Sequence, residues 1–500
     1  MKKFLLALMI LTLLAVGASG EEAKPVMAGF DSENASHEWK TNLFFQRMEE
    51  QTGLGFEFEQ YTDYKKWAER KKSMLDGKDL PEVLFKAELT DREIQELYNA
   101  GVLIDLRPYI EQYAPNLKAL LTEHPEWEKA ITLPDGAIAA LPCLNPMQNN
   151  NAMWINRKWL DTLGLEVPTS ANELTEVLRA FGTGDPNRNG KADEIPLNFI
   201  GMWDLRFLAH AYGIVTNDYY ICLGEDGTVR CPLDTDEYRE FILWLNDLWK
   251  ENLLFHNGFN VTDSMRQITD SKAVMTYGMF LTPSPVMLVP NTALDDYTVL
   301  YPLEYDGNRI YRDLFGDTVN GAFAITSACT SPEKAVAWVD ILYSEEGSRM
   351  ALYGLEGQEY VTNEKGYWMW NEALETVVND ILPNATIGEG GTVPGHVVPE
   401  VQLQYDEKNA RTSVEQLSKL KGYCVLPFPQ MIIPTETAEK ISALQAEIGP
   451  YAESCLAAFV CGDTVLDDQN WEAFTDGLKE RGMDEMIALW QGLADSYGGK

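Results

Sequence analysis

The stretch Asp185-Pro186-Asn187-Arg188-Asn189-Gly190-Lys191-Ala192-Asp193-Glu194 places oxygen-bearing side chains at the spacing of a calcium-binding loop. Gly190 falls at loop position 6, where such loops need a sharp turn, and the carbonyl of Lys191 falls at position 7. Position 12 is Pro196 instead of the usual glutamate, so Glu194 is the nearest candidate for the closing carboxylate. The predicted Ca²⁺ ligands are Asp185, Asn187, Asn189, Lys191, Asp193 and Glu194. The alternative interpretation is a polar Asn/Gly turn that starts a helix.

The segments on both sides of this loop follow an order that is typical of one protein family. Upstream, INRKWLDTLGLEVPT (residues 155–169) precedes a helix-like stretch at 171–180, and Ile195-Pro196-Leu197 follows the loop. This order resembles the extracellular solute-binding proteins of carbohydrate ABC importers, in the subgroup where an INxxWLxxLGL-PT stretch leads into a DPNxNGxxDEIP loop. The resemblance implies a structural Ca²⁺ in the loop, an oligosaccharide ligand, ABC permease subunits as partners and a monomeric chain.

Further patches extend the resemblance from about residue 26 to residue 497. They include GKDLPEV (77–83), SPEKA (331–335) and NWEAFTDGLKERGMDEM (470–486). Pro332 and Glu333 also predict a helix start, because proline fits the first turn and a carboxylate fits the N-terminal dipole. In the family the SPEKA helix belongs to the first lobe. The resemblance therefore implies lobe 1 at 21–145 plus 315–350, and lobe 2, with the calcium loop 185–194, at 146–314 plus 351–500.

The N-terminal part alternates strand-like stretches (26–30, 55–59, 80–85) with helix-like ones (39–51, 64–75, 91–100). This alternation predicts an α/β fold with a mostly parallel sheet and helices on both faces. At 500 residues the chain exceeds what one core usually serves, so at least two lobes are expected. Together with the resemblance, this predicts a two-lobe periplasmic-binding-protein-like fold of type II, with each sheet mostly parallel. Connections near 145, 315 and 350 would form the hinge.

The N-terminus has the pattern of an export signal. Lys2 and Lys3 precede an apolar run at 4–16 and the small residues 17–20. This run is shorter than the about 20 residues that cross a bilayer, so we expect residues 1–20 to be a cleaved signal peptide. The mature chain is expected outside the cell or at its surface, and in the periplasm where the source has an outer membrane. The family usually has a lipid-attachment Cys here, but this chain has no Cys before Cys143.

The composition restricts the class of ligand. The formal net charge is −37, and such a surface repels phosphate backbones, anionic lipids and polyanionic sugars. A neutral or cationic solute is therefore expected, and nucleic acid is not. A general solubility charge on an exported protein is the alternative explanation for much of this acidity.

A hairpin is predicted at 222–231, with Asp226-Gly227 as a type I′ turn. Counting outward from that turn places Cys222 opposite Cys231, within reach of a disulfide. The alternative is that both thiols stay reduced.

Motifs for bond-breaking chemistry are missing from the sequence. The five widely spaced histidines form no His-Glu-x-x-His zinc motif, and there is no Gly-x-Ser-x-Gly nucleophile elbow or phosphate-binding Gly-rich loop. The protein is therefore not expected to be an enzyme. Because acidic residues are abundant, a pair of catalytic carboxylates stays open, and a secreted glycoside hydrolase is the alternative function.

Aromatic residues in polar or Gly-containing loops are the expected sugar contacts, because a pyranose face stacks on an aromatic ring while its hydroxyls need polar partners. Polar candidates lie around the expected crossover to the first lobe. The predicted substrate-binding residues are Trp203, Tyr277, Asp313, Asp317, Asn320, Trp368 and Trp370. For each of them a core or surface position is the alternative, and a peptide or other solute could replace the sugar.

Overall fold

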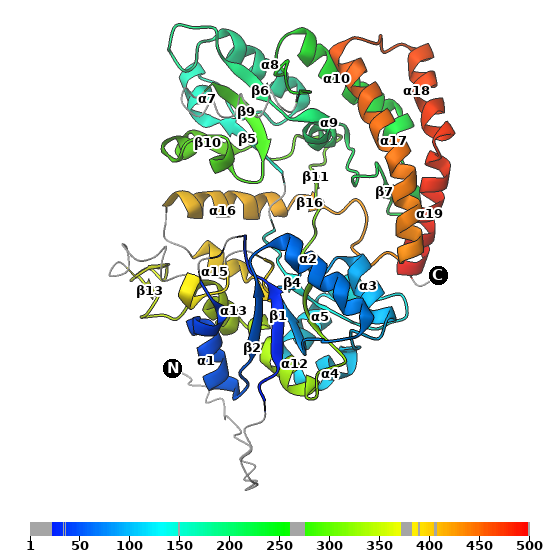
Figure 1. Ribbon diagram of the computed structural model, residues 1–500. Coiled ribbons are helices and arrows are strands. Elements are labelled where there is room, and N and C mark those ends of the chain that lie inside the picture. Colours follow the sequence, from blue (N-terminus) through cyan, green and yellow to red (C-terminus); the bar gives the residue numbers. More distant parts are fainter. Residues whose placement is uncertain are drawn as a thin grey trace, which may run out of the picture.

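The computed structural model describes residues 23–498 except 34, 36, 149–150, 261–275, 372–382, 389–390 and 405–407. The expected signal peptide therefore lies outside the described residues. Helices and two larger sheets form two bodies, stacked one above the other in Figure 1. We call the body around the six-stranded sheet, made of the described residues within 23–144 and 318–403, the lower body. The upper body surrounds the four-stranded sheet and comprises the described residues within 152–312, 408–425 and 435–497.

The lower sheet has the strand order β15-β4-β12-β3-β1-β2. Its strands are β1 (Val26–Phe30), β2 (Glu57–Tyr61), β3 (Val83–Phe85), β4 (Leu141–Leu144), β12 (Thr318–Ile325) and β15 (Gly395–His396). β1 is parallel to β2 and β3, and β15 is parallel to β4, whereas β12 is antiparallel to both of its neighbours. β12 reaches the middle of the sheet after the chain has built much of the upper body.

Both faces of the lower sheet are buried. Met27 and Phe85 belong to one apolar cluster, whereas Ala28 and Leu84 belong to the other, as alternation along a strand requires. The covering helices are α1 (Leu43–Thr52), α2 (Tyr64–Ser73), α3 (Asp91–Asn99), α4 (Arg107–Tyr113), α5 (Pro115–Glu123), α6 (Pro125–Ile131), α12 (Pro332–Asp340), α13 (Glu345–Tyr353) and α15 (Pro399–Leu403). α12 begins at Pro332, as the sequence predicted.

The upper sheet has the order β10-β5-β9-β6. Its strands are β5 (Ala152–Asn156), β6 (Ile195–Asn198), β9 (Tyr277–Thr282) and β10 (Tyr297–Val299). β5 is antiparallel to both β9 and β10, and of the described pairs β6–β9 is parallel. The α/β class is confirmed, but a mostly parallel sheet was wrong for the upper body. β5 enters directly from the lower body and runs against both strands that later flank it.

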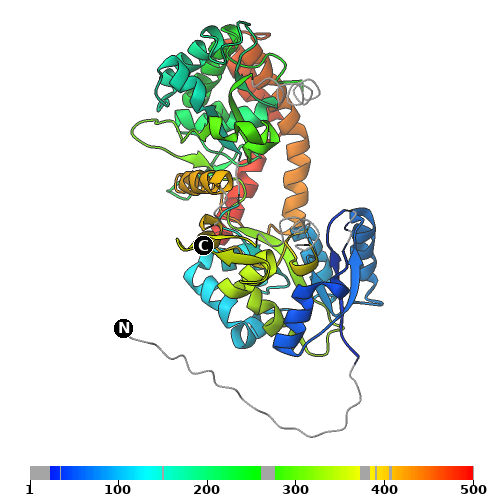
Figure 2. The same ribbon diagram turned by 90° about the vertical axis from the view of Figure 1, so that its left-hand side faces the viewer.

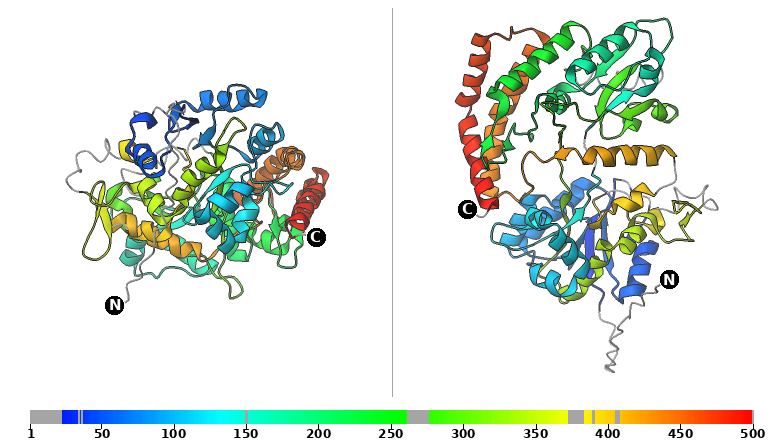
Figure 3. Two further views of the ribbon diagram at one scale, coloured as in Figure 1. Left: turned by 90° about the horizontal axis from the view of Figure 1, so that it is seen from below. Right: turned by 180° about the vertical axis from the view of Figure 1, so that it is seen from behind.

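The upper helices include a long C-terminal group. They are α7 (Arg157–Leu163), α8 (Ala171–Thr183), α9 (Gly201–Leu205), α10 (Asp236–Lys250), α16 (Lys408–Lys421), α17 (Thr435–Cys461), α18 (Asp468–Glu480) and α19 (Met483–Tyr497). α16 lies between the two bodies (Figures 1 and 3), and α17 runs from the lower body along the side of the upper one (Figure 2). Within the described ranges, no helix combines the length and apolar character that a membrane crossing requires.

The chain stays with the lower body for longer than the sequence predicted. β15 pairs with Cys143 and Leu144 of β4, and Asn42 Nδ2 donates to the carbonyl oxygens of Pro383 and Thr386 at 2.9 Å each. A small hairpin, β13 (Tyr360–Thr362) and β14 (Trp368–Trp370), precedes this return. The predicted boundary at 350 is therefore corrected, because the described part of 351–403 packs with the lower body.

The predicted hairpin forms as β7 (Cys222–Leu223) and β8 (Val229–Arg230), but its register differs. The amide of Gly227 donates to the carbonyl of Gly224, and Gly227 has φ +78°, so the turn contains one residue more than a type I′ loop. This shifts the pairing by one position and places Cys222 opposite Arg230. Cys222 and Cys231 are both free thiols, as in the alternative that the sequence left open.

A buried histidine in the upper body predicts a loss of stability in acid. His210 is 1% exposed, its Nδ1 lies 2.7 Å from the Phe207 carbonyl, and its Nε2 accepts from the Leu303 amide at 2.9 Å. Burial lowers its pKa to about 4. Because the folded pKa lies below the unfolded one, folding is stabilised by the neutral ring above pH 6.5, and about 3 kcal/mol is lost as pH falls from 6.5 to 4.

Urea unfolding at pH 7, 5 and 4 measures this loss. His210→Gln keeps an acceptor for Leu303 but does not titrate, so its free energy of unfolding should fall less than that of the wild type over this range. Equal losses in the two proteins would contradict the assignment.

Candidate functional site

The two bodies are joined by chain segments that lie close together, and these segments form the candidate site. Residues 145–148 and 313–317 meet where the Asn145 amide donates to the Asp317 carbonyl at 2.7 Å. Just above, β11 (Tyr311–Arg312) pairs in parallel with β16 (Cys424–Val425). Two of the predicted hinge connections, near 145 and 315, thus pass between the bodies, whereas residue 350 lies inside α13.

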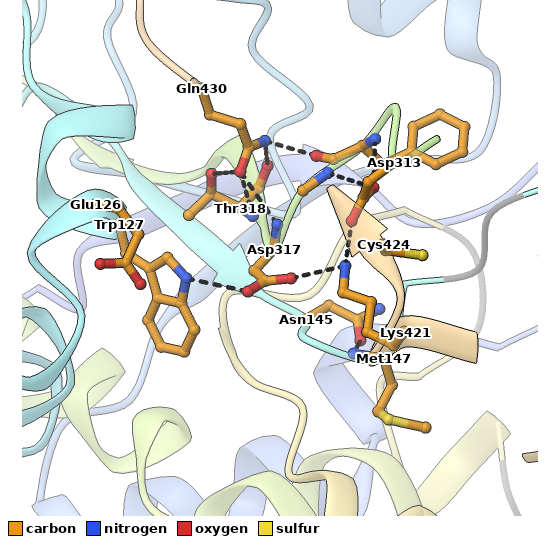
Figure 4. A network of polar contacts seen from close by, with 12 residues as sticks. Glu126, Trp127, Asn145, Met147, Asp313, Asp317, Thr318, Lys421, Cys424 and Gln430 are labelled. Carbon is orange, nitrogen blue, oxygen red and sulfur yellow. Dashed lines mark hydrogen bonds and ion pairs between the residues drawn. The ribbon is translucent and has the colours of Figure 1, made fainter. Parts of the chain in front are cut away.

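Two of the predicted polar residues meet one lysine at this junction. Lys421, the last residue of α16, places Nζ 2.7 Å from Asp313 Oδ2 and 2.9 Å from Asp317 Oδ1 (Figure 4). Asp317 Oδ2 also accepts from Trp127 Nε1 of the lower body at 3.4 Å. Burial lowers the pKa of Lys421, but the two carboxylates outweigh it and leave the pKa above its usual value. The network therefore keeps a charged lysine between two aspartates at neutral pH.

Gln430 holds the crossing segment in shape. Its Oε1 accepts from the amides of Asp317 and Thr318 and from the Thr318 hydroxyl at 2.7 Å, and its Nε2 donates to the Phe315 carbonyl at 2.6 Å (Figure 4). One side chain thus satisfies backbone groups on both sides of Gly316, which has φ +60°. Gln430 couples residues 315–318 to the segment that leads into α17.

A cavity of 440 Å³ lies beside this network and takes its walls from both bodies. Glu126 and Trp127 line it from α6, and the loop 223–225, Lys421 and Tyr497 line it from the upper body. Lys129 Nζ also lies 4.3 Å from the centre of the Tyr497 ring, a cation–π contact between the bodies. Any rotation of one body against the other must change the shape of this cavity.

The other side of β11 faces an aromatic platform. Because successive strand residues point to opposite faces, Arg312 points away from Asp313, and its Nη2 lies 2.9 Å from Asp218 Oδ1. The same oxygen accepts from Trp203 Nε1 at 3.1 Å. Trp203 is 37% exposed, and its ring lies 5.1 Å from that of Phe207. A positioned indole with an open face and a carboxylate beside it can stack a sugar ring and accept from a hydroxyl group.

A buried ion cluster lies at the carboxyl ends of β1 and β3 in the lower body. Lys86 Nζ and Asp31 Oδ1 are 2.6 Å apart, and their side chains are 0% and 1% exposed. Asp31 Oδ2 is 2.7 Å from His37 Nε2 and accepts from Gln60 at 3.0 Å. β1 enters from the bottom of Figure 1 and runs toward the upper body. This cluster therefore supports the surface of the lower body that faces the junction, where α/β proteins place their ligands.

The predicted calcium loop connects α8 to β6 and folds around Asp185. Asp185 has φ +48° and accepts from the amides of Asn189 and Gly190 at 3.0 and 3.1 Å. The Asn189 amide group also contacts the Asp193 carboxylate at 3.0 Å. Gly190 has φ +72°, as position 6 requires.

The side chain of Glu194 is the part of the loop that best fits a bound cation. Its Oε1 is buried and, within the described ranges, has no hydrogen-bond partner. Burial raises the pKa of Glu194, and the nearby Asp193 and Asp185 add to this shift. The described residues contain no cluster of three or more His, Cys, Asp or Glu side chains of the kind that holds a metal. The loop's donors are instead mixed carboxylate, amide and carbonyl oxygens, which are the ligands that Ca²⁺ takes.

The remaining predicted contacts lie elsewhere. Tyr277 is 1% exposed in the core of the upper body, so its expected role as a ligand contact is corrected. Asn320 Nδ2 donates to Asp91 at 2.9 Å and to the Ala130 carbonyl at 3.1 Å within the lower body. Trp368 is 4% exposed, and its ring lies 5.1 Å from the ring of Trp370 in the β13–β14 hairpin. None of these four residues lines the described cavity at the junction.

Sequence reasoning missed the partners that complete the junction. Lys421, Gln430, Trp127, Arg312 and Asp218 lie in segments without a motif, and contacts such as Trp127 to Asp317 join residues 190 positions apart. Local spacing carries no signal for such pairs. The sequence offers one clue in the neighbouring residues Arg312 and Asp313, because an extended backbone points such opposite charges to opposite sides.

Comparison with known proteins identifies the family. The family model described as "Bacterial extracellular solute-binding protein" matches residues 35–349, more than half of the chain. The chain belongs to this family. This solute-binding protein is 26% identical, over 91% of its length and 87% of the relative, to the fructooligosaccharide ABC transporter substrate-binding protein FusA of Streptococcus pneumoniae. It is also 23% identical, over 86% of its length and 81% of the relative, to the polygalacturonan/rhamnogalacturonan-binding protein YtcQ of Bacillus subtilis.

Solved structures agree with the fold of this solute-binding protein. An extracellular solute-binding protein of Bifidobacterium longum subsp. infantis matches with a TM-score of 0.77 at 24% identity, over 96% of this chain and all of that one. An EF-hand mutant of S. pneumoniae FusA in complex with fructo-nystose matches with a TM-score of 0.67 at 25% identity, over 95% of this chain and 99% of that one. The named relatives are binding proteins, not enzymes.

Proposed function

We propose that this protein is the extracytoplasmic binding component of an ABC importer and captures a neutral oligosaccharide between its two bodies. The observation that carries the proposal is Trp203, an indole that Asp218 holds beside β11 with 37% of its surface exposed. FusA, the relative named for fructooligosaccharide transport, supports the ligand class. The net charge of −37 favours a neutral glycan over an anionic one.

In this proposal the junction acts as the hinge. The lobes are residues 21–145 with 315–403, and 146–314 with 408–500, and the segments 145–148 and 313–317 bend between them. Ligand contacts made by both lobes favour the closed form only by their extra affinity for that form. The Lys421 pairs with Asp313 and Asp317 sit at the pivot and keep their charges neutralised as the lobes rotate.

Replacing Trp203 by alanine tests the binding platform. A stacked aromatic contact contributes about 0.5–1.5 kcal/mol beyond its buried area, so affinity should fall about tenfold. Isothermal titration measures this, with a neutral glycan taken from a thermal-shift screen of mono- to tetrasaccharides. Tyr113→Ala is the matched control, because Tyr113 is 40% exposed on α4 of the lower body. Unchanged affinity in Trp203→Ala, or a preference for uronic acid oligomers, would contradict the proposal.

In this proposal the ligand is released intact, because the protein binds it and the lobes rotate about the junction without breaking a bond in it. End-labelled oligosaccharide incubated with the protein and then freed by denaturation should be recovered at full length. Shorter products that persist after repeated purification would instead establish the glycoside hydrolase alternative.

We also propose that Ca²⁺ occupies the loop and is structural. Asp185, Asn187, Asn189, Asp193 and Glu194 would supply side-chain oxygens, and Lys191 its carbonyl. The buried Oε1 of Glu194 supports this, because an unpaired carboxylate oxygen is costly to bury. A structural role fits because the loop joins α8 to β6 within the upper body. In this proposal the protein is exported, is a monomer and delivers its ligand to ABC permease subunits.

A further inference from the structure

Two arginines are buried side by side in the upper body, behind the Trp203 platform. Arg206, the first residue of the short 3-10 helix Arg206–Tyr212, is 5% exposed, and Arg312 is 1% exposed. Arg206 donates to the carbonyl oxygen of Asn217 at 2.6 Å, and Arg312 donates to that of Thr216. Burial, followed by the charge of Arg206, lowers the pKa of Arg312 to about 10. The two buried guanidinium groups thus repel each other.

Among the residues that the structure describes, two carboxylates act on this pair or its neighbours, and both are exposed. Asp218 pairs with Arg312, but its side chain is 55% exposed. Glu453 acts on neighbouring Tyr220 and is itself exposed. Arg206 forms no ion pair with any residue that the structure describes, although its guanidinium carbon lies 4.0 Å above the ring of Tyr220. The cluster therefore carries excess positive charge, and burying an unpaired charge is expensive.

Several hydrogen-bond donors in this cluster have no acceptor. Arg206 Nε and the hydroxyl groups of Tyr220 and Tyr238 are buried, and in the part of the chain that the structure covers none of them has a partner. Burial raises the pKa of Tyr238, and Tyr220 adds to this shift, whereas Arg206 and Arg312 oppose it. The four groups are therefore close enough to interact electrostatically. Tyr220 has φ +61°, a conformation that costs energy for a bulky residue and is common at ligand clamps.

We propose that a monovalent anion of halide size binds between Arg206, Tyr220 and Tyr238. The N–H and O–H groups of these residues are donors, and a halide accepts several such bonds while neutralising the second guanidinium charge. A water molecule could accept from them but would leave the charge unbalanced. By holding Arg206, the anion fixes the segment 216–220, whose Asp218 orients Trp203.

Bromide is the probe for this site. Protein dialysed into sodium gluconate is titrated with sodium bromide at constant ionic strength, and its melting temperature is followed. A saturable rise in the millimolar range is expected, because gluconate is too large for an enclosed site. Crystals grown with bromide should give anomalous density between Arg206 Nε and the two tyrosine hydroxyl groups.

Single-atom variants locate the response. Tyr238→Phe removes one donor, and because a hydrogen bond to a charged group contributes about 1.5–3 kcal/mol, the half-saturating bromide concentration should rise tenfold or more. Tyr220→Phe, the second variant if Tyr238→Phe fails to fold, should do the same. Tyr219→Phe is the control, because its ring lies 5.3 Å from Trp490 and outside the cluster. Identical melting curves in bromide and gluconate, a response only near molar salt, or density that lacks an anomalous signal would overturn the proposal.

Discussion

Replacing Lys86 by methionine should lower the free energy of unfolding by about 3–5 kcal/mol, because it leaves a carboxylate buried without its main counter-charge. Lys86 is 0% exposed, and its Nζ lies 2.6 Å from Asp31 Oδ1 at the carboxyl end of the lower sheet. His37 and Gln60 also contact Asp31, but both bind its Oδ2, so the variant leaves Oδ1 without the Lys86 ammonium group. Urea denaturation followed by circular dichroism measures the loss.

Two further variants make this measurement specific. Lys65→Met removes an exposed lysine from α2 and should change stability by less than about 0.5 kcal/mol. Adding Asp31→Asn to Lys86→Met should recover part of the loss, because the unpaired charge is then gone. A loss below about 1 kcal/mol for Lys86→Met, or no recovery in the double variant, would show that the pair is not the source of stability.

Removing Ca²⁺ with a chelator should lower the melting temperature of the wild type by about 5–10 °C. The basis is linkage, since an ion present at one hundred times its dissociation constant stabilises the folded state by about 2.7 kcal/mol. Asp185→Ala should melt at the same temperature with and without Ca²⁺, because it loses the first ligand of the loop. Differential scanning calorimetry in EGTA and in Ca²⁺ measures both values.

Glu166→Ala controls for the loss of a negative charge, because Glu166 is exposed and lies before α8, outside the loop. It should keep the full response to Ca²⁺. Since Asp185 also accepts two backbone amides, Asp185→Ala will be less stable under all conditions. The relevant quantity is therefore the difference between the two buffers, and a difference retained in Asp185→Ala would rule out the proposed ion.

The parts of the fold that the sequence predicted well are those set by local chemistry. Pro332 begins α12, and Gly101 with φ +72° follows the end of α3, because proline and glycine restrict the backbone wherever they occur. The hairpin at 222–231 was predicted for the same reason. Its register was not, since one more residue in the loop moves Cys222 opposite Arg230 and separates it from Cys231.

Long-range pairing is where sequence reasoning failed. Nothing near residues 395–396 shows that they add a strand beside β4, so the lobe boundary was placed too early. At the junction, Asp313 and Asp317 could be selected by their position at a crossover. Their partner Lys421 could not, because the pairing depends on β11 and β16 lying side by side, a contact between segments more than a hundred residues apart.

The 27 residues of α17 make it a rod about 40 Å long. Its start is tied to the lower body, where Gln95 bonds the Ile433 carbonyl at 2.9 Å and the Thr435 amide at 3.1 Å. Farther along, the helix packs against α10, and the carbonyls of Phe459 and Val460 accept from Asn246 at 3.0 Å each. A helix attached to both bodies in this way prevents them from separating along its axis. The motion that it still allows is a rotation of the upper body about the N-terminal end of α17.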